Sequence, residues 1–356
     1  MKVLILSDPG TAGFEIGRTP TKFMTMIKAI EQGGLEGTHY FVGTTEELKA
    51  VLKKEHPDII FSAAYYTLDE AGKRRNIHGL LEAEGLPYIG SDETTLELVL
   101  SKAALKDKWM GTGISTPDYF VVSDKGMGFV EGLDKVEVEH DFPYIVKPSK
   151  GGNSRGILED SIVFSSSSLK KLVHDLLASY NEILVEQYLG RYEDIREFTV
   201  AMIGNGDQMI LMPCEIVFKV PKALRVITTS DKDEHRTRAI SIDDHGLYEE
   251  SCELANKAFH IAEVRDYSRL DVIYAGGKFY AIEINGQPMV PDKWFEACAR
   301  GVGLDKEQYM NAIFLAGISR NRREGNLKKC IPSALKRVIP IEMYERLVID
   351  TRLTKI

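Results

Sequence analysis

The stretch RLDVIYAGGKFYAIEIN, residues 269–285, consists of two runs of branched and aromatic residues on either side of a Gly-Gly pair. This pattern is typical of two antiparallel strands joined by a tight turn. Because alternate residues of a strand share one face, Glu283 and Asn285 lie on the same face, and Asp271 on the adjoining strand can converge with them. Such oxygen ligands suit magnesium, so one or two ions could bind here. An isolated E-x-N tripeptide is more often a solvated hairpin face, but its pairing with R-x-D at 269–271 favours a metal site.

Upstream, a lysine stands between a strand and a glycine-rich loop. The run YIVKP at 144–148 predicts an apolar strand that leads directly into GGNSRG at 151–156. Lys147 ends that strand, where its ammonium group could reach phosphate oxygens while N–H groups of the loop surround them. Alone this signal is weak, because a glycine-rich turn is more often a plain chain reversal and a lysine after a strand is often only an edge residue.

The first part of the chain predicts a parallel α/β domain. Residues 3–6 read as a buried strand, and the apolar residues between 23 and 30 fall on one face of a following helix. Residues 44–47 resemble a helix N-terminus with acidic residues in its first turn, and 58–61 and 86–90 read as further short strands. Strands alternating with helices in this way favour a parallel sheet.

Later strand patterns indicate a different, largely antiparallel sheet. They lie at 183–186, 197–202, 270–273 and 279–284. The predicted organisation is an N-terminal parallel α/β domain at 1–95, a central domain with the glycine loop at 96–182, a third domain with the metal site at 183–320, and a C-terminal appendage at 321–356.

Composition limits the class of protein. The 356 residues, 44% of them hydrophobic, can form two or three globular domains, and the formal net charge of -8 argues against nucleic-acid binding. The four cysteines are scattered without metal-ligand spacing, so reduced thiols are expected. The apolar run at the N-terminus is too short for a signal peptide or a membrane span. We therefore expect a cytoplasmic protein with small-molecule partners and neither a membrane nor a nucleic acid among them.

Several motifs together resemble, in order and spacing, the ATP-grasp fold of the D-alanine–D-alanine ligase family. They are Ser101-Lys102, Ile145 to Ser149, the loop at 151–156, Val185 to Leu189, Glu197 to Val200, Arg269 to Asp271 and Glu283 to Asn285. The likeness spans roughly residues 1 to 318 and includes Leu86 to Ser91, which resembles the end of that family's first domain. It implies an α/β (α+β) protein of three domains, with ATP held between two α+β domains.

The resemblance also implies roles for individual residues. Lys102 and Lys147 would touch the ATP phosphates, Glu186, Gln187, Tyr188 and Leu189 would read the adenine, Glu197 would hold the ribose, and Asp271, Glu283 and Asn285 would bind Mg²⁺, or Mn²⁺ in its place. Arg269 is the key catalytic candidate, because a permanently charged planar fork stabilises oxyanions as they develop. Ser154 of the glycine loop joins it as a catalytic candidate. Singly, each residue could equally be a surface ion pair or a core residue.

Departures from the family pattern fall mainly where the family binds its amino acids. Tyr65 stands in place of a histidine, Asn153 in place of a serine of the glycine loop, and Lys293 lies near the place of a serine that holds the second substrate's carboxylate. Lys293 could pair with a carboxylate or be a plain exposed lysine, and Trp294 could shape the pocket instead. Glu15 could bind a substrate ammonium group or simply be solvated.

The implied reaction is an ATP-dependent, acyl-phosphate route to an amide bond, which requires a lid against water. Loop 151–156 and the stretch at 219–238 are the two lid candidates, the latter with Lys219, Lys222 or Lys232 as lid lysine. The pocket departures favour a carboxylate-amine ligase acting on substrates other than two D-alanines. A genuine D-alanine–D-alanine ligase and a non-catalytic ATP-binding regulatory protein are the alternatives. A homodimer is suggested only by analogy with the family.

Overall fold

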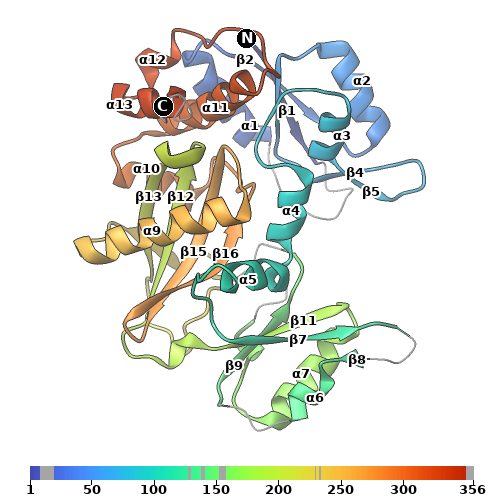
Figure 1. Ribbon diagram of the computed structural model, residues 1–356, viewed down its shortest axis with the longest axis vertical. Helices are drawn as coiled ribbons and strands as arrows, with labels where there is room; N and C mark the ends of the chain where they lie inside the picture. The colour runs from blue at the N-terminus through green and yellow to red at the C-terminus, as the bar shows by residue number, and fades with distance from the viewer. Residues whose placement is uncertain are drawn as a thin grey trace.

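The computed structural model describes residues 1–8, 20–126, 130–137, 141–151, 158–228, 230–231 and 234–349. In these residues the strands form three main sheets, arranged one after another along the long axis of the molecule (Figure 1). A short hairpin of β4 (Tyr66–Leu68) and β5 (Arg74–Asn76) stands beside the first sheet. Among the described helices, none combines the length and apolar character needed to cross a membrane.

The first sheet is parallel and has the order β2-β1-β3-β6. Its strands are β1 (Lys2–Ser7), β2 (Glu36–Phe41), β3 (Ile59–Ser62) and β6 (Tyr88–Ile89), and its helices are α1 (Pro20–Gln32), α2 (Thr45–Glu55) and α3 (Ile77–Ala83). The predicted helix start at 44–47 is confirmed, because the side chains of Thr44 and Glu47 form a capping box with each other's backbone N–H groups. The predicted parallel sheet is confirmed as well.

The second sheet is antiparallel and has the order β10-β9-β11-β7-β8. It consists of β7 (Tyr119–Asp124), β8 (Val130–Glu131), β9 (Tyr144–Pro148), β10 (Ile162–Val163) and β11 (Glu182–Gln187), with helices α6 (Leu133–Glu137) and α7 (Ser166–Leu177). The strand predicted at 183–186 exists, but its assignment to the third sheet is wrong. It pairs with β9 and β7 instead. Strand periodicity reports which face is buried and carries no information about the partner strand.

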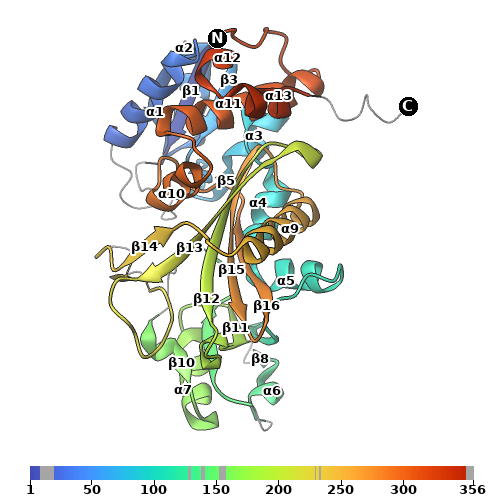
Figure 2. The ribbon, with the colours of Figure 1, turned by 90° about the vertical axis from the view of Figure 1, so that its left-hand side faces the viewer.

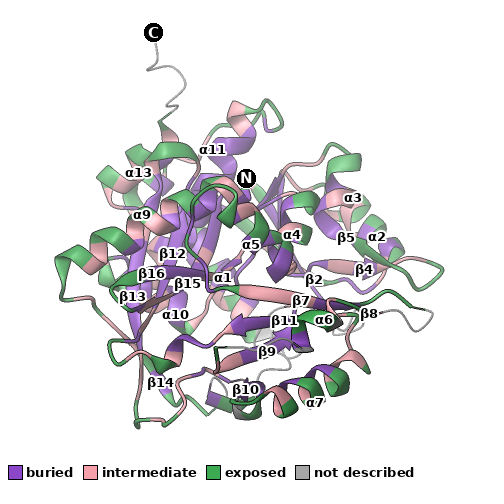
Figure 3. Ribbon diagram, turned by 60° about the horizontal axis from the view of Figure 1, so that its bottom comes forward, coloured by how far each residue is buried: buried purple, intermediate pink, exposed green. Residues whose placement is uncertain are grey.

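The third sheet has the order β14-β13-β12-β15-β16 and is also antiparallel. Its strands are β12 (Arg196–Ile203), β13 (Ile210–Phe218), β14 (Thr237–Ile240), β15 (Tyr267–Ala275) and β16 (Lys278–Asn285), and its helices are α9 (His245–Ala262) and α10 (Lys293–Gly301). The helices cover opposite faces (Figure 2). Along β12, Val200 and Met202 pack with α9, whereas Ala201 and Ile203 join the cluster that contains α10. Burial on both faces leaves these strands largely inaccessible (Figure 3).

The chain passes between the sheets through continuous elements. Helices α4 (Glu93–Leu100) and α5 (Lys102–Met110) lead from the first sheet to the second, and α11 (Lys306–Arg323), α12 (Leu335–Val338) and α13 (Ile341–Val348) return to the first. The boundaries predicted at 95, 182 and 320 therefore fall inside α4, at the start of β11 and inside α11. Residues beyond 320 share a core with the first sheet, because Leu335, Ile339 and Leu347 belong to the same apolar cluster as its strands.

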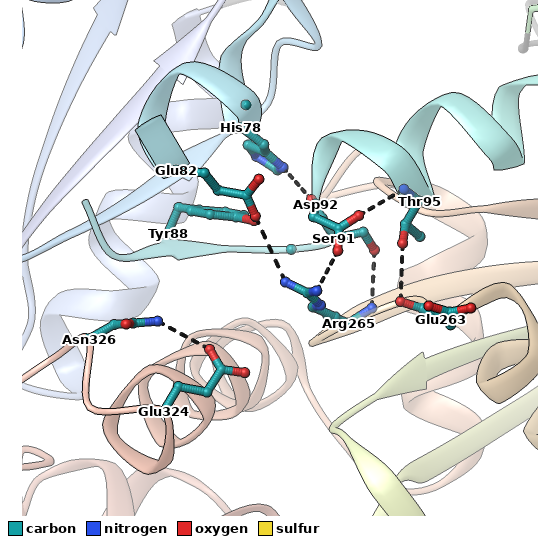
Figure 4. Close-up of polar contacts among 12 residues, drawn as sticks. His78, Glu82, Tyr88, Ser91, Asp92, Thr95, Glu263, Arg265, Glu324 and Asn326 are labelled. Atoms are coloured by element: carbon teal, nitrogen blue, oxygen red, sulfur yellow. Dashed lines mark hydrogen bonds and ion pairs between the residues drawn. The ribbon is translucent and has the colours of Figure 1, made fainter. Parts of the chain in front are cut away.

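Aromatic stacking and polar contacts join the first and third sheets. The Phe61 ring stacks on Tyr267 of β15 and on Phe314 of α11, with centroid distances of 5.8 and 5.4 Å. Around Arg265, shown in Figure 4, the guanidinium group contacts Asp92 and the backbone N–H donates to Ser91 Oγ at 3.0 Å. The loop before β15 is thereby tied to the loop before α4.

A fully buried ion pair lies next to this seam. Arg320 donates to both carboxylate oxygens of Asp266 at 2.8 Å, and the same carboxylate accepts from Gly90 N and Asn205 Nδ2 at 2.8 and 2.9 Å. Burial alone would raise the pKa of Asp266, but the charge of Arg320 and these hydrogen bonds hold it below its ordinary value. One carboxylate thus connects α11 with the first and third sheets.

We predict that Asp266→Asn destabilises the protein by about 3 to 5 kcal/mol, because it leaves the buried Arg320 with only the partly exposed Glu324 as a counter-charge. This loss of stability is measured as the change in the free energy of unfolding in chemical denaturation. The matched control is Lys171→Gln, which breaks the exposed pair with Asp175 on α7 and should leave the midpoint unchanged. Equal stability of the Asp266→Asn protein and the original protein would contradict the role given to this pair.

Candidate ATP and metal site

Two sheet faces meet to form the candidate site. In the second sheet, Val146 and Val185 pack in the core with α7, so Lys147 and Glu186, one position further along their strands, project from the opposite face. That face is turned towards the third sheet (Figure 2). Lys147 is only 4% exposed although it is charged. Strand alternation is therefore what aims these two residues into the cleft.

The opposing wall comes from β12, β15 and β16. Thr199 pairs with Asp271, Asp271 with Glu283, and Arg269 with Asn285 across the strands. The Thr199 hydroxyl donates to Asp271 Oδ1 at 2.6 Å. These residues share the face that α10 covers, so the predicted hairpin and its convergence of polar side chains are confirmed.

A single cleft contains most of the predicted site residues. Those that line it are Lys102, Lys147, Glu186, Gln187, Tyr188, Leu189, Glu197, Asp271 and Glu283. Arg269 and Asn285 lie next to it on the same strands. Tyr65 and Lys293 do not line it, and Glu15, Asn153 and Ser154 lie outside the described residues. Thr199, Arg225, Val226 and Trp294 also line it. Trp294 was expected to shape the pocket if Lys293 did not, Arg225 and Val226 belong to the predicted lid stretch, and Thr199 had no predicted role of its own.

Three lysines gather at one end of this cleft. Lys102, the first residue of α5, donates to Gly151 O at 2.6 Å and lies 3.9 Å from a carboxylate oxygen of Glu283. Lys147 lies 2.9 Å and Lys106 2.7 Å from the carboxylate of Glu186. Sequence reasoning missed Lys106, although its spacing of four from Lys102 places both on one side of a helix.

Glu197 projects into the cleft from the start of β12. Burial raises the pKa of Glu197 to about 7, and the nearby cation Arg225 only partly opposes this. One of its carboxylate oxygens is buried and accepts no hydrogen bond from the described residues. A carboxylate in this state is suited to accept hydroxyl donors from a ligand, as the resemblance implies for the ribose.

Asp271, Glu283 and Asn285 offer two carboxylates and an amide oxygen on adjacent strands. The carboxylates are directly paired across β15 and β16, and the buried Asn285 Nδ2 has no hydrogen-bond partner among the described residues. A hard divalent cation takes oxygen ligands of this kind and completes its shell with water and phosphate oxygens. The donor set fits Mg²⁺ or Mn²⁺, and metal binding by these three residues stays a prediction.

Arg269 is held between two carboxylates. Its Nε lies 3.2 Å from Asp271 and its Nη1 3.1 Å from Asp292, and its guanidinium carbon lies 5.2 Å from the centre of the Trp294 ring. Burial alone would lower the pKa of Arg269, but Asp271 and Asp292 raise it above its ordinary value. The group is a fixed cation next to the candidate metal ligands, suited to stabilise negative charge.

The stretch predicted as a lid closes one side of the cleft. Val226 lines the cleft, and Arg225 donates to the carbonyl of Ile195 at 2.8 Å. Lys222 lies 2.8 Å from the buried carboxylate of Asp231. Of the three candidate lid lysines, Lys222 is thus tied into the loop itself, and Lys232 lies outside the described residues.

The candidate substrate-binding residues lie outside this cleft, Tyr65 after strand β3 of the first sheet and Lys293 at the start of α10. Tyr65 is buried, and its hydroxyl donates to Gln287 O at 3.5 Å, while the Gln287 amide donates to the carbonyl of Ser62. Lys293 is exposed, 3.5 Å from His235 Nδ1 and 5.7 Å from the Trp294 ring centre. Bulky side chains therefore occupy the positions where the family pattern has a histidine and small residues.

Comparison with known proteins agrees with this geometry. A family profile described as "D-ala D-ala ligase C-terminus" matches residues 109–314. The D-alanine–D-alanine ligase of Aquifex aeolicus is 26% identical over 88% of this chain and 99% of its own length, and D-alanine–D-alanine ligase B of Pseudomonas putida is 27% identical over 83% and 86%. The crystal structure of D-alanine–D-alanine ligase from Bacillus anthracis complexed with ATP superposes with a TM-score of 0.65 at 18% identity, covering 91% of this chain and all of that one.

We predict that ATP binding weakens as the pH falls through the pKa of Glu197, about 7. Protonation below that pH removes the charged acceptor that ribose hydroxyls would use, so KM for ATP rises. The test compares KM for ATP of the original protein and of Glu197→Gln between about pH 6 and about pH 8. The substituted protein cannot titrate at this position, so only the ratio of the two constants reports on Glu197. A ratio that does not change with pH would contradict the prediction.

Proposed function

Because the chain belongs to the D-alanine–D-alanine ligase family of ATP-grasp enzymes, we propose that it joins the carboxylate of one small molecule to the amine of another, and that the two substrates are not both D-alanine. As a member of this family it is an ATP-dependent ligase that forms C–N bonds. The observation that carries the proposal is Arg269 paired with Asp271, which lines a cleft together with Glu283, Lys102 and Lys147.

In the first step an oxygen of the substrate carboxylate attacks the γ-phosphorus of ATP. The bond between that phosphorus and the β,γ-bridging oxygen breaks, ADP leaves, and an acyl phosphate forms. Little covalent chemistry is required of the protein, so positioning and charge do the work. Lys102 and Lys147 are the cations placed to hold the phosphates, and Glu197 and the segment Glu186 to Leu189 would orient the nucleoside.

In the second step the amine attacks the acyl carbon and phosphate leaves from a tetrahedral intermediate. Its oxyanion needs a cation that does not lose its proton, and Arg269, fixed by two carboxylates, meets that need. Asp271, Glu283 and Asn285 would hold Mg²⁺, which neutralises charge on the phosphates when bound. The stretch at 219–238 would keep water from the acyl phosphate. The other lid candidate, the glycine loop, lies outside the described residues from 152 onward.

The proposal that the substrates are not two D-alanines rests on the size and charge of the side chains at the expected amino-acid pocket. Tyr65 and Gln287 fill space beside β3, and Trp294 lies against Arg269 near the place of the family's carboxylate-binding serine. Lys293 adds a cationic group over the same tryptophan ring and lies 3.5 Å from His235. A pocket built in this way favours an acceptor of another size than D-alanine.

A genuine D-alanine–D-alanine ligase is the second candidate, and the names of the relatives favour it. A non-catalytic ATP-binding protein is the third, and the presence of Arg269 with all three metal-ligand candidates speaks against it. A cytoplasmic location, a homodimer and the lack of a nucleic-acid partner belong to the proposal as well, the last because of the net charge of -8.

The deciding experiment incubates the protein with ATP, Mg²⁺ and L- and D-amino acids, dipeptides and other small carboxylates, singly and in pairs. Phosphate release together with the mass of a condensed product names the substrates. Rapid turnover with D-alanine alone would establish the second candidate and overturn ours. ATP binding without phosphate release across the whole panel would favour the non-catalytic protein.

We predict that Arg269→Ala lowers kcat by roughly 10² to 10³, because the developing oxyanion loses its fixed positive charge. Binding of ATP should be much less affected, since Arg269 does not line the cleft. Steady-state kinetics and calorimetric ATP binding measure the two effects separately. Arg300→Ala, on the exposed side of α10, is the matched control and should leave kcat unchanged. Full activity of the Arg269→Ala protein would contradict the mechanism.

A further inference from the structure

Glu186 lies between two lysine ammonium groups in a site with almost no access to water. Its Oε1 is 2.9 Å from Lys147 Nζ and its Oε2 is 2.7 Å from Lys106 Nζ. Glu186 is 3% exposed, Lys147 4% and Lys106 0%. One buried carboxylate therefore faces two buried cations, so it can balance only one of their two positive charges.

The two lysines differ in where they can reach. Lys147 lines the cleft beside Lys102, so its ammonium group can meet a ligand. Lys106 does not line the cleft, and it is held from behind by Thr116, whose hydroxyl accepts from Lys106 and donates to the carbonyl of Ala281 at 2.9 Å. Lys106 is fixed in the wall of the site, and Lys147 faces the ligand.

A buried carboxylate that loses its only cation is strongly destabilised. If Lys147 were the sole partner of Glu186, its attraction to a phosphate would compete directly with its attraction to Glu186, and nucleotide binding would leave Glu186 uncompensated. With Lys106 in place, Glu186 keeps a counter-charge whichever way Lys147 turns. The second lysine therefore changes how strongly Lys147 can bind a phosphate.

We propose that Lys106 is the permanent counter-ion of Glu186 and that its role is to release Lys147 to the phosphates of ATP. Lys106 is thus a positioning residue, acting on the nucleotide through Glu186 and Lys147 without touching it. The inference rests on the ATP-binding part of the proposed function.

The ionisation of the group agrees with this assignment. Burial alone would raise the pKa of Glu186, but the charges of Lys106 and Lys147 hold it below its ordinary value, so it stays a carboxylate. Burial lowers the pKa of Lys106 to about 8, while Glu186 opposes that fall, so Lys106 is largely charged at neutral pH. The charges required by the proposal are therefore present.

The test measures how much the phosphates contribute to nucleotide affinity. Calorimetry gives Kd for ATP with Mg²⁺ and Kd for adenosine, and their ratio isolates the phosphates from the nucleoside. For Lys106→Met we expect the ratio Kd(adenosine)/Kd(ATP) to fall at least about tenfold, because Lys147 is then retained by Glu186. Lys108→Met, two residues along α5 and paired with Glu263 on the surface, is the matched control and should leave the ratio unchanged.

The double variant Lys106→Met with Glu186→Gln removes one positive and one negative charge together, so Lys147 has no buried carboxylate to hold it. We expect its ratio to return to within about threefold of the original, even if adenosine itself binds less well. This variant also serves if Lys106→Met alone fails to fold, since it leaves no unpaired buried charge between these two positions.

Two results would overturn the proposal. One is a Lys106→Met protein that binds ATP and adenosine with equally reduced affinity, which would make Lys106 a support for the nucleoside pocket. The other is a double variant whose ratio is as low as that of a folded Lys106→Met protein. Failure of the unsubstituted protein to bind ATP would instead count against the proposed function, so the two failures are distinguishable.

Discussion

A charge buried between two sheets must be balanced, and this constraint arranges the centre of the molecule. Glu186 is balanced by two lysines, Arg269 by two aspartates and Asp266 by Arg320. Glu197 is the exception: Arg225 opposes the effect of burial only in part, so the pKa of Glu197 is raised to about 7. The charged groups that can act on a ligand are therefore those whose ion pairing is incomplete or shared between several partners. Asp266 and Arg320, by contrast, are paired with each other and connect the first and third sheets with α11.

Local patterns predicted the parts of this arrangement that depend on one strand or one helix. The helix start at 44–47 and the hairpin at 269–285 follow from local patterns, because helix-start signals, turn chemistry and strand alternation act over a few residues. The family resemblance then brought Lys147, Glu197 and Asp271 together, and the structure places all three in one cleft.

What sequence reasoning missed depends on packing between elements. The strand at 183–186 was assigned to the wrong sheet, because the alternation of buried and exposed residues does not identify the neighbouring strand. The predicted domain boundaries fell within α4 and α11 or at the first residue of β11, because no linker separates the sheets. For Lys106 the sequence offers only its spacing of four from Lys102. Asp292 is the N-cap of α10, and only the fold shows that its carboxylate also holds Arg269.

If the proposed function holds, the same geometry separates the residues for phosphate chemistry from those that would select the substrates. Arg269, Asp271 and Glu283 stand on the hairpin β15–β16, whose register fixes their positions relative to one another, opposite Lys147 of the facing sheet. Trp294 stands on α10, where it lines the cleft and lies with its ring against the guanidinium group of Arg269. In the proposed function, a change at Trp294 can therefore alter which acceptor fits while Asp271 and Glu283 keep their places on the hairpin. For this reason the residues for phosphate transfer can match the family pattern in this chain while the amino-acid pocket departs from it.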